Sequence, residues 1–283
     1  MYRGATSILP KMKHLFYLAL LLTVASACNL QQDIEIELPL FDEQPLVECY
    51  LEPGLPYRLT LSTSQAFLAE VTQDILIDDA TVTIGYDGQE IELENGLFID
   101  FEFSRVYNYR SPELVPFDTE RDFTLRIVTA DGRTITDTTR ILPAIPIDSL
   151  VTRNNGDTLN LVLTYITDPA DEDNFYRRVF YEDGTTISNS EVEQDFSTDD
   201  AFVSEGGSIV FGTAFEYVAG DTVFSAIYHI DEDYFNFINS VQTAVQSNGN
   251  PFAIPNVIQS TVTGAYGVFT GLSYDRDTLI IGQ

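Results

Sequence analysis

The sequence predicts a mainly β protein with two tandem antiparallel β-sandwich-like domains, the first Ig-like or transthyretin-like, and one amphipathic helix near the C-terminus of the second. Most apolar segments after residue 40 alternate with period two, as in half-buried strands. Asp-Gly pairs at 87–88 and 131–132 separate such segments, where glycine tolerates the positive φ of tight hairpin turns. One segment alone, near 231–247, has strong helical periodicity.

Residues 1–27 have the pattern of a lipoprotein signal peptide. Lys11 and Lys13 precede an apolar segment that is shorter than the ~20 residues a spanning helix needs. Small residues then lead directly to Cys28, the pattern that a lipoprotein signal peptidase reads after the thiol has received diacylglycerol. We therefore predict that Cys28 is lipidated and begins the mature protein. The alternative is a soluble secreted protein, and translation could begin at Met1 or at Met12.

Two cysteines occur in the chain, Cys28 and Cys49. They could pair in an oxidising compartment. Because Cys49 lies in a strand-like run, we expect it to be a small buried thiol instead.

Residues 28–40 are predicted to be a tether and a first edge strand, with alternation from Ile34 to Leu38. Residues 41–142 are predicted to form the N-terminal β-sandwich domain. Its alternating positions are Tyr57, Leu59 and Leu61; Ala80, Val82 and Ile84; and Phe123, Leu125 and Ile127. Residues 143–149 form a connector stiffened by prolines.

Residues 150–283 are predicted to form the C-terminal β domain. Leu159, Leu161 and Leu163 alternate, and glycines at 264, 267 and 271 suggest bends or bulges in the last strands. Residues 187–207 are acidic and lack strong periodicity, which predicts a long loop, either a disordered excursion or a functional lid.

The helix is predicted over residues 231–247. Tyr234, Ile238, Val241 and Val245 share one face, which we expect to dock on the second sheet. Asp231 is placed to cap the first turn.

The charge of the mature chain narrows the possible functions. Of the 14 basic residues three precede Cys28, whereas all 44 acidic residues follow it, so the mature chain carries 11 − 44 = −33. Such a surface repels phosphates and anionic headgroups, which excludes nucleic-acid binding and a polybasic membrane patch. We interpret it as a solvated acidic coat, with a cation-collecting or glycan-facing surface as the alternative.

Several segments together resemble a known family. They are LVECYLEPGLPYRLTLS, DDATVTIGYDG, TYITDPADEDNFYRR and YFNFINSVQTAVQSNGNPFAIPNVIQSTVTGAYGVFTG. They are similar to the Bacteroidota outer-membrane lipoproteins catalogued as domain of unknown function 4249. The best matches are Asp168, Pro169, Asn174 and Tyr176, and Asn250, Pro251, Phe252 and Pro255. Because such proteins are common beside TonB-dependent transporters, the resemblance implies a role in nutrient capture; it supplies no catalytic residues.

The sequence offers few groups for catalysis. The mature chain has one histidine, His229, so a histidine-rich zinc site is excluded and a Ser-His-Asp triad is not expected. We expect His229 to be a core or sheet-face imidazole. Asp168, Asp171, Asp173 and Asn174 are candidate calcium ligands, with turn formation as the alternative role of Asp168 and Asn174.

These observations predict a non-catalytic binding or accessory protein, lipid-anchored in the outer membrane through Cys28, on the periplasmic or cell-surface side. The expected partners are membrane lipid and a TonB-dependent transporter, and no cofactor is expected beyond the candidate calcium. The alternatives are an extracellular glycan-acting hydrolase with paired carboxylates, and a structural or adhesive surface protein.

Overall fold

The computed structural model describes residues 42–65, 75–100, 105–156, 158–170, 172–182, 191–203, 206–247 and 257–282. The predicted signal peptide, Cys28 and the predicted edge strand at 34–38 lie outside them. Residues from Asp42 onward belong to one compact unit. Within the described part of the chain, every helix is too short or too polar to cross a membrane.

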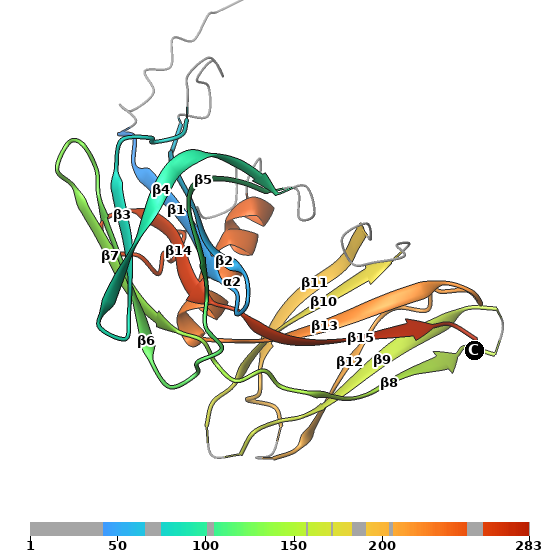
Figure 1. Cartoon of the computed structure of the whole chain (residues 1–283). Coiled ribbons are helices and arrows are strands. Elements are labelled where there is room, and N and C mark those ends of the chain that lie inside the picture. Colours follow the sequence, from blue (N-terminus) through green and yellow to red (C-terminus); the bar gives the residue numbers. More distant parts are fainter. Residues whose placement is uncertain are drawn as a thin grey trace, which may run out of the picture. The chain divides into compact units, whose positions relative to one another are not determined.

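Eight strands form the first sheet, in the order β14-β1-β2-β5-β4-β3-β6-β7 (Figure 1). They are β1 (Pro45–Leu51), β2 (Pro56–Thr63), β3 (Thr81–Tyr86), β4 (Gln89–Asp100), β5 (Arg105–Leu114), β6 (Asp122–Val128), β7 (Thr134–Arg140) and β14 (Tyr266–Gly271). The mainly β prediction is confirmed. However, β14 pairs with β1 in parallel, so the expectation of purely antiparallel sheets is wrong at this edge.

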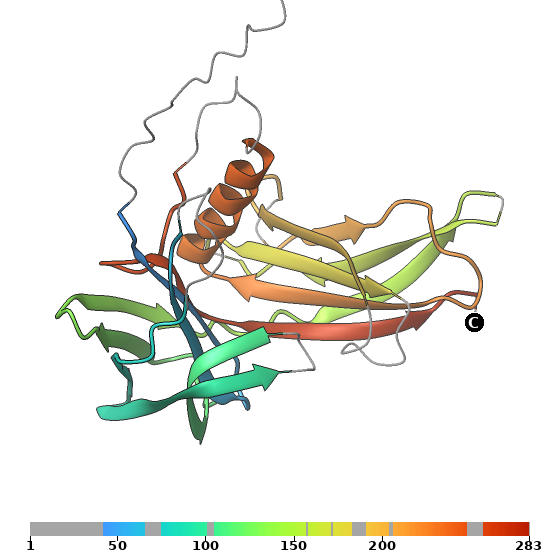
Figure 2. The same cartoon turned by 90° about the horizontal axis from the view of Figure 1, so that it is seen from above.

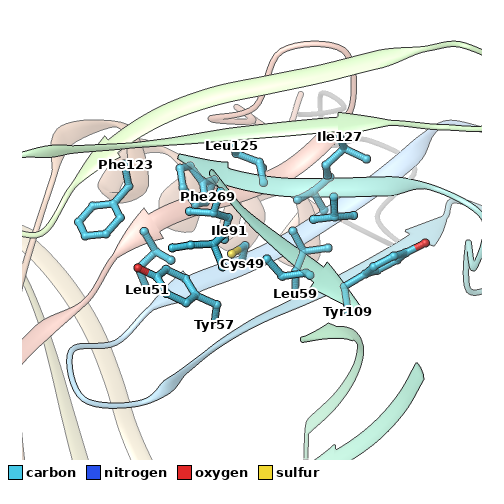
Figure 3. Close-up of a cluster of buried hydrophobic side chains, with 14 of the residues drawn as sticks. Cys49, Leu51, Tyr57, Leu59, Ile91, Tyr109, Phe123, Leu125, Ile127 and Phe269 are labelled. Atoms are coloured by element: carbon cyan, nitrogen blue, oxygen red, sulfur yellow. The ribbon is translucent and has the colours of Figure 1, made fainter. Parts of the chain in front are cut away.

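The core of this sheet follows the predicted alternation. Side chains from β1, β2, β3 and β6 point into one cluster, as Figure 3 shows for Cys49, Leu59 and Leu125. Every second residue of β6 is buried, at Phe123, Leu125 and Ile127. Cys49 is fully buried, and burial raises the pKa of its thiol, as expected of a packing residue.

The two outer strands of this sheet, β14 and β7, approach each other. Thr136 and Thr263 exchange backbone hydrogen bonds of 3.1 and 2.9 Å. A Cβ on Gly271 would lie 2.7 Å from the Arg140 carbonyl oxygen, and one on Gly267 would overlap the backbone of Val47. The predicted glycine bends are therefore places where two backbones come too close for any side chain.

Seven strands form two further sheets that enclose a second core. One has the order β11-β10-β13-β15 and the other β12-β9-β8, all antiparallel. The strands are β8 (Ile147–Asn154), β9 (Asn160–Thr167), β10 (Phe175–Glu182), β11 (Glu191–Asp199), β12 (Ser208–Gly212), β13 (Thr222–Ile230) and β15 (Ser273–Ile280). Apolar clusters draw members from both sheets, which confirms a sandwich-like arrangement.

A polar layer divides this second core. Thr164 of β9, Arg178 of β10 and Ser225 of β13 are buried, and each has an apolar core residue two positions before it and two positions after it on its strand. One apolar cluster holds Val162, Phe180 and Val223 on one side of the layer, and another holds Ile166, Tyr176 and Ile227 on the other side. The Thr164 and Ser225 hydroxyls are 2.7 Å apart and bond to each other.

Two predictions for this region are corrected. The most deeply buried face of β9 is Val162, Thr164 and Ile166, whereas Leu161 and Leu163 are half-buried. The segment 187–207, predicted to be a loop, contains strand β11. The strand lacks a clear apolar period because it is a polar edge strand, whose Ser197 bonds Asn239 of the helix rather than packing in a core.

The chain passes three times between the first sheet and the other two, once between β13 and β14 and twice through short links. Residues 141–146 lead from β7 to β8, and β14 continues into β15 after the single residue Leu272 (Figure 2). The Leu272 N–H donates to the Leu51 carbonyl at 2.8 Å, and the Ser273 hydroxyl donates to the Leu142 carbonyl at 2.5 Å. These bonds hold the two passages against β1 and against each other.

The predicted helix is confirmed as α2 (Glu232–Ser247). The Tyr234 N–H donates to Asp231 Oδ1 at 2.7 Å, which is the predicted cap. The helix contacts β10 and β11, as expected, but also β14. Tyr234 is buried, whereas Val245 is 68% exposed, so the predicted apolar face docks at its first turns and not at its last.

Candidate functional site

A cavity of about 570 Å³ lies where four separate segments meet. They are the turn between β1 and β2 (52–55), the segment 117–119 after β5, the passage 141–144, and the start of β15 (272–276). Small-molecule sites in proteins typically measure roughly 300–1,000 Å³. The cavity is therefore large enough for an organic ligand.

Apolar side chains form most of the cavity wall. Ile141 and Leu272 contribute buried surface, whereas Phe117 is 85% exposed. The Phe117 ring lies over Gly54, where its nearest carbon would be 3.1 Å from an added Cβ. Gly54 also has a φ of +82°, so glycine satisfies both the turn and the close approach of the ring.

Glu52 is the first of two carboxylates in the wall. It accepts from Arg58 at 3.1 Å, and Arg58 also donates to Asp100 at 2.5 Å. Burial raises the pKa of Glu52, and the neighbouring Arg58 charge opposes that shift.

Asp118 is the second carboxylate. It accepts from the Tyr86 hydroxyl at 2.6 Å and from the Glu120 N–H at 2.8 Å, and it lies 3.7 Å from Arg121. The Tyr86 hydrogen bond is the main reason that the pKa of Asp118 is lowered. Both carboxylates of the cavity are therefore held by partners of their own.

Arg276 is the cation of the cavity wall. Its guanidinium carbon lies 5.6 Å from the centroid of the Tyr274 ring, which also lines the cavity. Within the described ranges, no carboxylate forms an ion pair with Arg276.

The predicted calcium ligands fall in a different place. Asp168 is buried and accepts from the Tyr176 hydroxyl at 2.6 Å. Asp173 is exposed, and Asp171 lies outside the described residues. Burial, with the bond to Asp168, raises the pKa of Tyr176.

Asn174 joins this group to His229. Its amide nitrogen donates to the Pro169 and Glu172 carbonyls at 3.2 and 3.0 Å, which is the turn-forming role. Its amide oxygen lies 3.0 Å from Nε2 of His229, and Nδ1 of the same ring lies 2.8 Å from the Pro143 carbonyl. Burial lowers the pKa of His229.

The four residues that best match the family in the second region, Asp168, Pro169, Asn174 and Tyr176, thus lie close together. Tyr176 bonds to Asp168 and stacks on His229, and Asn174 bonds to the Pro169 carbonyl and contacts His229. Hydrogen bonds within the protein already engage oxygens of Asp168 and Asn174. Among the residues that the structure describes, no group of three or more His, Cys, Asp and Glu side chains could hold a metal. Calcium binding stays a prediction.

Sequence reasoning did not single out the cavity residues. Phe117 and Arg276 carry no motif, and four segments far apart in the chain must fold together before they meet. The one available signal is Phe117 itself, a large aromatic residue that stands between Pro116 and the polar stretch DTERD.

Comparison with known proteins identifies one family. The family described as domain of unknown function DUF4249 matches residues 31–278. No curated protein matches the chain. Among solved structures, trypsin-activated alpha-2-macroglobulin from Escherichia coli is 11% identical, with a TM-score of 0.25; the match covers 68% of this chain but only 15% of that one.

Proposed function

Because the chain belongs to the DUF4249 family, whose function is unknown, we propose its role from its own residues: a lipid-anchored outer-membrane protein that binds a small ligand without catalysis. In this proposal it is a Bacteroidota lipoprotein and an accessory component of a TonB-dependent nutrient transporter. The family resemblance supports the transporter, and the sequence around Cys28 supports the anchor.

The observation that carries the binding role is the cavity of about 570 Å³. Its wall is mostly apolar, with a few charged groups at defined positions, as in typical ligand sites. Both carboxylates are held by Arg58, Tyr86 and Arg121, which favours binding over proton transfer by these groups.

The anchor is tested by mass spectrometry of the mature N-terminus. We expect a diacylglyceryl mass on Cys28 and none on the Cys28→Ser variant, which should leave the membrane fraction. A Ser26→Ala variant keeps a small residue before the cysteine and serves as the control. An unmodified Cys28 in membrane-free fractions would contradict the anchor.

The transporter is tested by affinity purification of the tagged chain from its native outer membrane after mild solubilisation. We expect a TonB-dependent transporter to be enriched with the wild-type chain and depleted with Cys28→Ser. If repeated purifications enrich no such transporter, the accessory role is wrong.

A glycan-acting hydrolase is the second candidate. Glu52 and Asp118 line the same cavity, and their pKa values shift in opposite directions, as in an acid and base pair. The hydrolase predicts release of reducing ends from a glycan panel, and loss of that release in both Glu52→Gln and Asp118→Asn. An intact panel after prolonged incubation rejects it.

A further inference from the structure

We propose that the cavity binds an organic anion with an apolar body, whose anionic group pairs with Arg276 while its body rests against Phe117. This inference deepens the proposed function, on which it rests, by naming the class of ligand. The anionic group is a carboxylate, sulfate, sulfonate or phosphate, each of which a guanidinium recognises through paired N–H donors.

The charges in the wall select an anion. Of the three charged side chains that line the cavity, Glu52 pairs with Arg58, and Asp118 is held by Tyr86 and Arg121. Arg276 is left without a carboxylate partner among the described residues. Arg276 therefore places in the cavity wall a positive charge that no carboxylate of the described residues neutralises by an ion pair.

Aromatic contacts position the Arg276 guanidinium. It lies over the Tyr274 ring at 5.6 Å, and Tyr274 in turn packs against Tyr228 with ring centroids 4.9 Å apart. A ring face attracts the cation but accepts none of the in-plane N–H bonds. The N–H edges of Arg276 therefore stay available to a ligand.

The rest of the wall selects an apolar body. Phe117 lines the cavity and is 85% exposed, although a phenyl ring in water is unfavourable. Leu55, Leu142 and Leu272 complete an apolar surface. A small inorganic anion would leave this surface uncovered, so a larger organic molecule fits the site better.

Two fluorescent dyes that share an aromatic body test the proposal. The sulfonate 1-anilinonaphthalene-8-sulfonate carries the anion, and N-phenyl-1-naphthylamine lacks it. Each is titrated against the unlipidated Cys28→Ser chain in detergent-free buffer. We expect the sulfonate to bind at least about tenfold more tightly than the neutral dye, because a charge-assisted bond of about 1.5–3 kcal/mol corresponds to about tenfold or more.

Three variants in this background locate the binding. Arg276→Gln should weaken the sulfonate by about tenfold and leave the neutral dye unchanged, whereas Phe117→Ala should weaken both dyes. Arg153→Gln removes an exposed arginine of β8 that does not line the cavity, and it should change neither. Equal melting temperatures show that the variants fold.

Equal affinity of the two dyes, no binding of either dye, or binding that Arg276→Gln and Phe117→Ala leave unchanged would each overturn the proposal. None of these outcomes tests the proposed lipid anchor at Cys28 or the proposed transporter partner. Failure of the ligand class is therefore distinct from failure of the proposed function.

Discussion

The two cores of the protein are built on different principles. The first, inside the eight-stranded sheet, is one continuous apolar cluster. The second is divided by the polar layer of Thr164, Arg178 and Ser225. Period-two alternation thus positions side chains in both regions, but only in the second does a polar layer lie between two apolar clusters.

The largest effect is expected in β14, which belongs to the first sheet and continues after one residue into β15 of the second region. Gly267→Ala puts a Cβ into the backbone of Val47 and imposes a φ of +123° on an L-residue. We expect it to lower the free energy of unfolding by more than about 4 kcal/mol, or to prevent folding. Gly88→Ala, also at positive φ but with open space around it, should cost about 1–2 kcal/mol. Urea denaturation measures both, and equal losses would contradict the steric argument.

A large loss is expected in the continuous core. Leu59 is fully buried in the first cluster, so Leu59→Ala should lower the free energy of unfolding by about 2–5 kcal/mol. The exposed Leu114→Ala in β5 is the control and should change it by less than about 0.5 kcal/mol. A small effect of Leu59→Ala would show that the first core tolerates cavities and would weaken the comparison.

The polar layer predicts a different response. Thr164→Val leaves the buried Ser225 hydroxyl without its partner and should cost about 1–3 kcal/mol. Adding Ser225→Ala removes the orphaned hydroxyl, so the double variant should recover part of that loss. A double-mutant cycle in urea measures the coupling, and simple additivity would show that the two hydroxyls do not act as a pair.

Arg178 gives the sharpest contrast between the cores. It is buried, its Nε has no hydrogen-bond partner, and its two bonds go to the neutral oxygens of Gly212 and Gln194. Replacing a poorly compensated buried charge by an apolar side chain is often stabilising, so Arg178→Met should raise the free energy of unfolding by about 1 kcal/mol. A loss of the same size would mean that the layer is needed for stability.

The smallest effect concerns pH. Burial lowers the pKa of His229 below its ordinary 6.5, so the unfolded chain binds the proton more readily than the folded one. The contribution of His229 to stability is therefore present above pH 6.5 and is lost as the pH falls below that value. Between pH 7.5 and 5.5 we expect the melting temperature of wild type to fall by about 1–3 °C more than that of His229→Gln. An equal fall in the melting temperatures of both proteins would show that His229 does not contribute to the pH dependence of stability.

The local structure was largely predictable from the sequence. Two features depend only on neighbours in the chain. They are the alternation at Val82 and Ile84 and the Asp87-Gly88 turn, whose φ values are 49° and 75°. The Asp231 cap follows from the same kind of local chemistry. Strand β11 was missed because its polar residues bond to Arg177, Arg178 and the helix rather than filling a core.

The candidate site was not predictable, for a physical reason. Phe117 and Arg276 line the same cavity only because β14 pairs with β1 and then leads directly into β15, which contains Arg276. Pairing between strands so distant in sequence has no local signal. The family resemblance points to Asp168 and Asn174, and the single histidine of the mature chain points to His229. The sequence does not predict that these residues lie together.

The position of β14 also determines the order in which the protein can be completed. Strand β1 is synthesised before the other described strands, yet one of its two edges stays unpaired until Tyr266–Gly271 has been made. Contacts of such high sequence separation form slowly and leave an open strand edge exposed in the meantime. Until β14 has been synthesised, the nascent chain can therefore pair with other chains through this open edge, and the pairing of β14 with β1 closes it.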